Sequence, residues 1–123
     1  SLIIAIIEKY GMITLGDYDI FVNIAGGLNV SEPSVDLAIA AAIISSYRNR
    51  PIKKSLSFLG ELGLGGEVRS ISGIDLRLKE LSLLGFGECV IPFGIKDSLD
   101  KKNLGNINLI ECKNIKSLFD LIF

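Results

Sequence analysis

A proline and a serine stand together at residues 33 and 34, near the start of the apolar run VSEPSVDLAIAAAIISS that spans residues 30–46. A serine at a helix start could attack a carbonyl, because nearby backbone N–H groups could stabilise the oxyanion that forms. The serine needs a base, and the chain contains no histidine. The base would therefore be a lysine kept neutral by desolvation. Spacing alone favours Ser34 as a plain first-turn residue.

The glycine-rich segment GELGLGG at residues 60–66 invites comparison with phosphate-binding loops. A P-loop places a lysine after its last glycine, whereas Glu67 follows here, and its carboxylate would repel phosphate. The G-x-G-x-x-G dinucleotide spacing fails too, because Val68 stands three positions after Gly65. We interpret the segment as the turn of an antiparallel hairpin over residues 56–71, with glycines that adopt positive φ.

Four cations gather in the heptapeptide RNRPIKK, namely Arg48, Arg50, Lys53 and Lys54. Such a cluster can bind DNA phosphates by releasing counterions. A solvated helix end whose cations complement the helix dipole is the slightly favoured alternative. The formal net charge of −1 is not that of a strongly basic protein, so any DNA binding must come from a local patch. The pair Lys101 and Lys102 is a weaker candidate, because it lies in a mixed-charge loop.

Length and composition indicate one globular α/β domain over residues 1–123, in which 49% of the residues are hydrophobic and 22% are charged. No apolar run approaches the ~18 residues that cross a bilayer, and the N-terminal segment lacks the features of a signal peptide. We therefore expect a soluble, cytoplasmic protein with no membrane contact. Cys89 and Cys112 lack metal-site or redox spacing, so we expect two core residues and no metal site.

Hydrophobic periodicity and turn residues divide the chain into helices and strands. Helices are predicted at residues 2–10, stopped by Gly11, at about 34–46, at 73–85, stopped by Gly85, and at 114–123, capped by Asn114. Strands are predicted at 18–27, in the hairpin over 56–71, and in the segments ECVIPFG and NINLIEC. Residues 95–106 are expected to form a surface loop or short helix, and Asp75 is expected to pair with Lys79.

Two long segments carry a family resemblance: FVNIAGGLNVSEPSVDLAIAAAIISSYRNRPI (residues 21–52) and FLGELGLGGEVRSISGIDLRLKELSLLGF (residues 58–86). Both resemble the C-terminal domain of the bacterial RadA (Sms) DNA-repair family, which is similar to the proteolytic domain of Lon. The resemblance implies an α/β (α+β) fold with a mixed sheet packed with helices. It also implies that domain's Ser-Lys dyad as the site to compare.

The dyad positions are degenerate in this chain. Lon's nucleophile lies in a Gly-Pro-Ser-Ala-Gly pattern, and the stretch from Glu32 to Asp36 keeps Pro-Ser but replaces both glycines. Lon's lysine follows Gly-Gly-Leu, and Asp75 occupies that position here. An exposed carboxylate is too weak a base to deprotonate an alkanol. Lys79 is a poor substitute, because Asp75 would keep it protonated. Ser34 and Asp75 are therefore expected to be relic positions, with no catalytic residue.

The resemblance also implies a larger parent protein with a zinc-binding segment and a RecA-like ATPase, so zinc and ATP are expected for the parent and no cofactor for this domain. Such proteins act as ring-shaped oligomers on branched recombination intermediates, with a recombinase as a candidate partner. Opening strands are expected before SLIIAIIEKYG, and their absence would leave an unpaired edge or apolar patch.

We therefore expect a protease-dead scaffold that supports ring assembly and contributes DNA contacts. Two alternatives remain open: an active Ser-Lys peptidase, which requires a lysine near Ser34, and a purely structural oligomerisation module.

Overall fold

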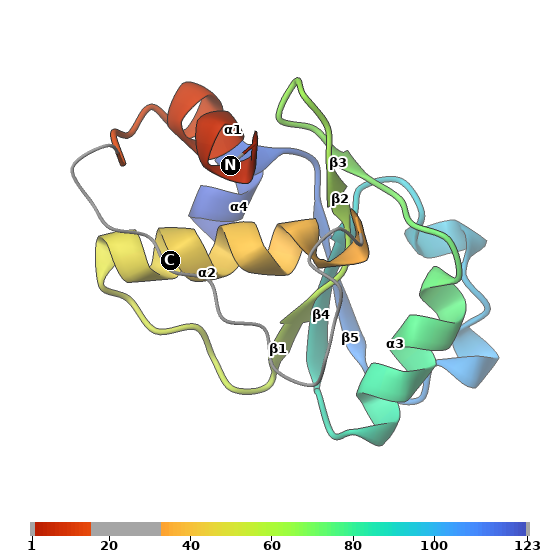
Figure 1. Ribbon diagram of the computed structural model, residues 1–123. Helices are drawn as coiled ribbons and strands as arrows, with labels where there is room; N and C mark the ends of the chain where they lie inside the picture. Colours follow the sequence, from red (N-terminus) through yellow and green to blue (C-terminus); the bar gives the residue numbers. More distant parts are fainter. Residues whose placement is uncertain (1, 16–32, 123) are drawn as a thin grey trace.

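The computed structural model describes residues 2–15 and 33–122 (Figure 1). The helices are α1 (Leu2–Gly11), α2 (Asp36–Arg48), α3 (Ile74–Leu83) and α4 (Ile115–Ile122), and the short 3-10 helices are η1 (Pro33–Val35), η2 (Lys96–Ser98) and η3 (Lys101–Asn103). The strands are β1 (Leu56–Phe58), β2 (Glu61–Leu62), β3 (Val68–Arg69), β4 (Glu88–Pro92) and β5 (Asn108–Cys112). The strand predicted at residues 18–27 lies outside the described residues.

The main sheet has the strand order β1-β4-β5 and is parallel throughout the part of the chain that is described. A separate antiparallel pair joins β2 to β3, with Leu62 opposite Val68. The predicted hairpin is therefore correct only for Glu61–Arg69. Leu56–Phe58 leaves it for the parallel sheet, where Phe58 pairs with Val90. The short β-like run did not reveal its partner, because parallel pairing is set by distant segments.

Helices cover both faces of the parallel sheet, with α1, α2 and α4 on one side and α3 on the other (Figure 1). Side chains of β4 alternate between two hydrophobic cores, as strand geometry requires. Val90 packs in the core beneath α1, α2 and α4, whereas Cys89 and Ile91 pack in the core beneath α3. The predicted α/β class is confirmed, and so is the burial of both cysteines.

Helix α1 ends as predicted, but Gly11 serves a different purpose from the one expected. Met12, and not Gly11, takes the left-handed conformation that follows the helix, with φ 58°. A Cβ on Gly11 would collide with the ring of Phe119 in α4. Gly11 therefore allows close helix packing. Because α1 packs against α2 and α4, Ile6 and Ile7 are buried in the same core.

The other predicted elements are present with shifted ends. Asn114 caps α4 by accepting a hydrogen bond of 2.9 Å from the Ser117 amide. Residues 95–106 contain η2 and η3. Helix α3 begins after Gly73 and buries Leu78. Asp75 and Lys79 form no ion pair, although the structure describes both, so the predicted pairing is wrong. Both side chains are exposed, where such pairing contributes little.

Candidate functional site

Ser34 lies in η1, which packs against β2 and the start of α2. Its residue surface is only 4% exposed, so the hydroxyl is not presented to solvent. Ser31 and Glu32, whose side chains could cap this helix, lie outside the described residues. Pro33 opens the 3-10 turn, consistent with the preference of proline for the first turn of a helix.

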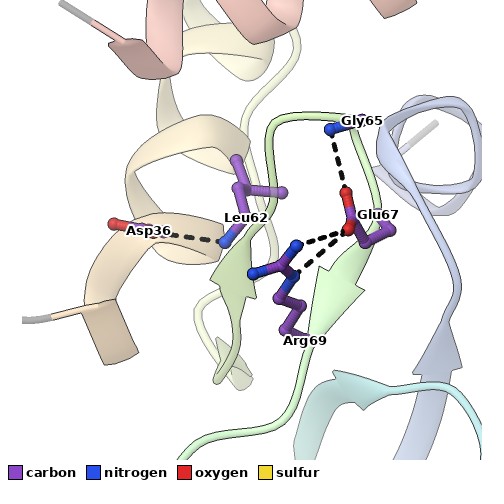
Figure 2. Close-up of polar contacts among 5 residues, drawn as sticks. All are labelled: Asp36, Leu62, Gly65, Glu67 and Arg69. Carbon is purple, nitrogen blue, oxygen red and sulfur yellow. Dashed lines mark hydrogen bonds and ion pairs between the residues drawn. The ribbon is translucent and has the colours of Figure 1, made fainter.

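The start of α2 is tied to the segment after β1 by two hydrogen bonds, one between backbones and one to a side chain. The Leu37 amide donates to the Gly60 carbonyl at 3.1 Å. The Leu62 amide donates to Asp36 Oδ2 at 3.1 Å (Figure 2). Burial raises the pKa of the Asp36 carboxyl, and the nearby Glu61 charge adds to that rise. The Leu37 amide could have stabilised an oxyanion, but it already donates to the Gly60 carbonyl. The charge that acts on Asp36 beside it is the negative charge of Glu61.

Asp75 lies in the first turn of α3, on the helix that covers the opposite face of the sheet. Its side chain is exposed. No hydrogen bond joins Ser34 to Asp75 or to Lys79, all three of which are described. The described residues therefore contain no assembled dyad between Ser34 and either position.

The glycine-rich turn is closed by a carboxylate of its own. Glu67 accepts hydrogen bonds from the Gly65 amide at 3.0 Å and from the Arg69 guanidinium at 3.1 and 2.9 Å (Figure 2). A hydrogen bond from the residue's own backbone amide, followed by those from Arg69 and Gly65, lowers the pKa of the Glu67 carboxyl. Only Gly66 in this turn has positive φ, so the expectation for its other glycines is wrong. Gly63 leaves room for the Glu67 carboxylate.

Residues 48–54, here called the basic loop, begin with the last residue of α2, Arg48, and continue into the connection that follows the helix (Figure 1). Asn49 adopts the left-handed conformation with φ 55°, and the amides of Asn49 and Arg50 bond the carbonyls of Ser46 and Ser45. This is the Schellman arrangement, which fixes where the chain leaves the helix. The loop and Ser34 therefore lie at opposite ends of α2, about 20 Å apart along its axis.

The four cations of the basic loop have different surroundings. The Arg48 guanidinium lies 4.7 Å from the centroid of the Phe119 ring, so part of its side chain packs on α4. Lys53 Nζ lies 3.6 Å from Glu88 Oε1 in an ion pair whose lysine side chain is 74% exposed. Arg50 and Lys54 are exposed. The predicted cluster is thus one surface segment in which all four cations are exposed.

Sequence reasoning missed a cavity of about 240 Å³ lined by residues from α1, the glycine turn and the start of α4. It also missed the role of Asp36. The sequence did contain a sign of the cavity, because a lysine precedes Tyr10 and another lies at the start of the last helix. Among the described residues, no three His, Cys, Asp or Glu side chains gather as a metal site. No helix of the described ranges is long and apolar enough to cross a membrane.

The described chain is an α/β domain in which helices cover both faces of a parallel sheet. A family model described as "Subunit ChlI of Mg-chelatase" matches residues 3–95, so the chain belongs to the ChlI family. That description is the family's, and it names no residue of this chain.

Curated relatives have a different name. The chain is 40% identical over 122 residues to the DNA repair protein RadA of Chlamydia trachomatis, covering 99% of this chain and 27% of the relative. It is 48% identical over 92 residues to the RadA of Campylobacter jejuni, covering 75% of this chain and 21% of the relative. The RadA of Aquifex aeolicus is 40% identical over 111 residues, covering 90% of this chain and 25% of the relative. The chain thus spans about a quarter of the length of these relatives.

Proposed function

We propose that this chain is a non-catalytic, Lon-like scaffold domain of a RadA-type DNA repair protein, which contacts DNA through the basic loop and supports assembly into a ring. The observation that carries the proposal is the 40% identity to a protein named DNA repair protein RadA over 99% of this chain. The chain spans about a quarter of these relatives, so the ATP and zinc chemistry that the family resemblance implies for a parent protein would lie outside this chain.

The surroundings of Ser34 support the non-catalytic part of the proposal. A serine nucleophile needs a base within hydrogen-bond reach and a stabilised oxyanion. Asp75 stands at the position of the base, and Asp36 adds a second carboxylate two residues from the serine. Negative charge opposes an alkoxide. The alternative, a Ser-Lys peptidase, predicts peptide turnover that Ser34→Ala abolishes, and such turnover would contradict the proposal.

The accessibility of Arg50 and Lys54 supports the DNA contact. Exposed cations beside a duplex displace condensed counterions, and this contributes affinity without reading sequence. Lys53 can exchange its partly buried Glu88 partner for a phosphate at small cost, because the lysine side chain is 74% exposed and surface ion pairs contribute ~0–1 kcal/mol. Arg48 is a poorer choice for mutation, since its removal also loses packing against Phe119.

Apolar side chains on α3 support the assembly part of the proposal. Leu76 and Leu83 are seven residues apart and therefore lie on one helix face, and they are 62% and 78% exposed. Leu84 extends this face and is also exposed. We call these three residues the α3 leucine face. Contact with a second copy would bury them. The same face would serve the remaining alternative, a structural module without DNA contact.

A salt titration of DNA binding tests the proposal. Fluorescence anisotropy with a labelled duplex compares the wild type with the Arg50→Ala/Lys54→Ala variant. Each lost phosphate contact flattens the log–log salt slope by about 0.9, so we expect a change of one to two units. The Lys101→Ala/Lys102→Ala variant carries the same charge change at η3 and is expected to keep the wild-type slope. Equal slopes for all three proteins would contradict DNA contact through the basic loop.

A further inference from the structure

The strand β5 is an edge of the described parallel sheet, because β4 pairs with one side of it and no described strand pairs with the other side of residues 108–112 (Figure 1). The Asn108 amide donates to the Gly87 carbonyl at 2.8 Å, so the backbone groups of Asn108 face β4. Backbone groups alternate in direction along a strand. The N–H and C=O groups of Leu109 and Glu111 therefore point to the open side.

These outward groups are available for pairing. Neither Leu109 nor Glu111 uses them in a hydrogen bond to any described residue. A row of such donors and acceptors is a template onto which another extended chain can pair. The strand contains no proline, which would remove a donor, and Glu111 is its one charged residue. The backbone of β5 can thus accept an added strand.

The same side of the chain already pairs just beyond the end of β5. The Val68 amide of β3 donates to the Lys113 carbonyl at 2.9 Å. Glu67 and Asn114 form an isolated antiparallel bridge beside this contact. The chain then leaves the edge, since Ile71 packs against the core beneath α3. An added strand would continue the pairing that β3 begins, in the same antiparallel direction.

The side chains of β5 define what an added strand should carry. Leu109 is buried in the core beneath α3, and Glu111 lies on the same face of the sheet because it is two residues further along. The Glu111 carboxylate makes no ion pair or hydrogen bond within the described chain. Ile110 lies on the opposite face and is only partly buried. A basic residue opposite Glu111 and an apolar residue opposite Ile110 would complement the strand.

We propose that the open edge of β5 binds an extended peptide of a partner protein, which adds as an antiparallel strand with a basic residue opposite Glu111 and apolar residues opposite Ile110 and Leu109. In this mode of recognition, main-chain hydrogen bonds give affinity and alternate side chains give specificity. The inference concerns other residues than the basic loop and the α3 leucine face, so it does not rest on the function proposed for them.

Charge distinguishes this occupant from a second copy of the chain. The sequence of β5, NLIEC, contains an acidic residue and no basic one. The β5 strand of a second copy would therefore bring no counter-charge to the Glu111 carboxylate. Like charges on paired strands oppose association, whereas opposite charges favour it.

The test measures binding of the full chain to the fluorescein-labelled peptide Ser-Thr-Lys-Val-Val-Thr-Ser by anisotropy. Antiparallel addition places its lysine opposite Glu111 and its two valines opposite Ile110 and Leu109. Methylation of the backbone nitrogen of the second valine removes the donor to the Leu109 carbonyl and is expected to weaken binding about tenfold. Methylation of the first valine is the matched control, because that N–H points away from β5, and it is expected to leave the affinity unchanged.

A charge exchange tests the position of the basic residue. The peptide with glutamate in place of lysine is expected to bind the wild type about fivefold more weakly. The Glu111→Lys variant should reverse this preference, and Glu111→Thr should lose it while keeping the backbone N–H. An unchanged preference in Glu111→Lys would overturn the proposal, and so would equal binding of the two methylated peptides.

Hydrogen exchange of single amides locates the peptide. The Leu109 and Glu111 amides are expected to exchange fast in the free chain and slowly with the peptide, whereas the Ile110 amide, which faces β4, is slow in both. Exchange that the peptide does not slow at Leu109 and Glu111 would overturn the proposal.

Sedimentation velocity addresses the alternative occupant. Glu111→Pro removes an outward N–H at an edge position, where proline is tolerated. If this variant is a monomer and the wild type a dimer, the edge binds a second copy and the peptide proposal is overturned. The Leu76→Ser/Leu83→Ser variant is expected to bind the peptide like the wild type, so the edge of β5 and the α3 leucine face can fail independently.

Discussion

At the scale of single residues, Asp36 has the most informative position. Its carboxylate accepts the hydrogen bond of the Leu62 amide and so holds β2 against the start of α2 (Figure 2). Burial raises the pKa of this carboxyl above its ordinary value of 3.8. The folded state thus favours the protonated form. Its contribution to stability is full below the unfolded pKa and is lost as the pH rises through the folded pKa.

Asparagine and alanine at position 36 separate the hydrogen bond from the charge. Asp36→Asn keeps an acceptor for the Leu62 amide without a buried charge, so we expect its free energy of unfolding at pH 7 to equal or exceed that of the wild type. Asp36→Ala leaves the amide without its acceptor and is expected to cost about 1–2 kcal/mol. Urea unfolding between pH 4 and pH 7 measures both. The advantage of Asp36→Asn should grow as the pH rises, and a constant difference would contradict the assigned role.

The relic positions show how far the residue types alone could lead. The absence of histidine excluded most nucleophilic machinery, and the Pro-Ser pair indicated where a serine could act. Neither observation could reveal that Ser34 is buried or that the Leu37 amide already bonds Gly60. These contacts join residues more than 20 positions apart, and spacing within one helix carries no information about them.

At the scale of elements, the helices were predictable because their periodicity is local. The pairing of the strand Leu56–Phe58 was mispredicted, because its parallel partner β4 lies about 30 residues further along the chain. Gly11 was correctly placed at the end of a helix, but its purpose depends on α4, more than 100 residues away. A glycine required by close packing and a glycine required by positive φ look the same in a sequence.

Gly11→Ala tests whether the packing of α1 on α4 requires the missing side chain. A methyl group there meets the Phe119 ring, and such overpacking typically costs about 1–3 kcal/mol. Gly87→Ala is the matched control, because its nearest neighbour would be a side-chain atom at 4.0 Å and its φ is not positive. That control is expected to leave stability unchanged or slightly raised. Thermal unfolding of both variants decides, and equal melting temperatures would contradict the packing role.

At the scale of the whole molecule, the apolar composition is only partly used inside the fold. The N-terminal LIIAII segment is apolar enough to suggest a partner-facing surface, yet Ile6 and Ile7 are buried in the protein's own core, while Leu2 is 61% exposed. Two exposed leucines, Leu76 and Leu83, lie on α3, which covers the opposite side of the sheet, and Leu84 follows directly after it. The outer side of α3 carries these leucines among exposed charged residues, including Lys79 and Glu80, so the sequence pattern did not single out a partner-facing side in advance.

The α3 leucine face predicts concentration-dependent self-association. Leu76→Ser/Leu83→Ser replaces two exposed leucines, so folding should be unaffected. We expect the dissociation constant of self-association, measured by sedimentation velocity, to rise at least tenfold. Leu64→Ser removes a comparably exposed leucine from the glycine turn and is expected to sediment like the wild type. A wild type that stays monomeric at high concentration would contradict assembly through this face.

The two buried cysteines report separately on local opening of the two cores. Cys89 lies in the core beneath α3 and Cys112 in the core beneath α1, α2 and α4, and both are fully buried. Burial raises the pKa of each thiol to about 11, so neither reacts with a disulfide reagent until its own layer opens. The rates at which the two thiols are modified in native buffer therefore time the opening of the two layers separately, without any introduced label.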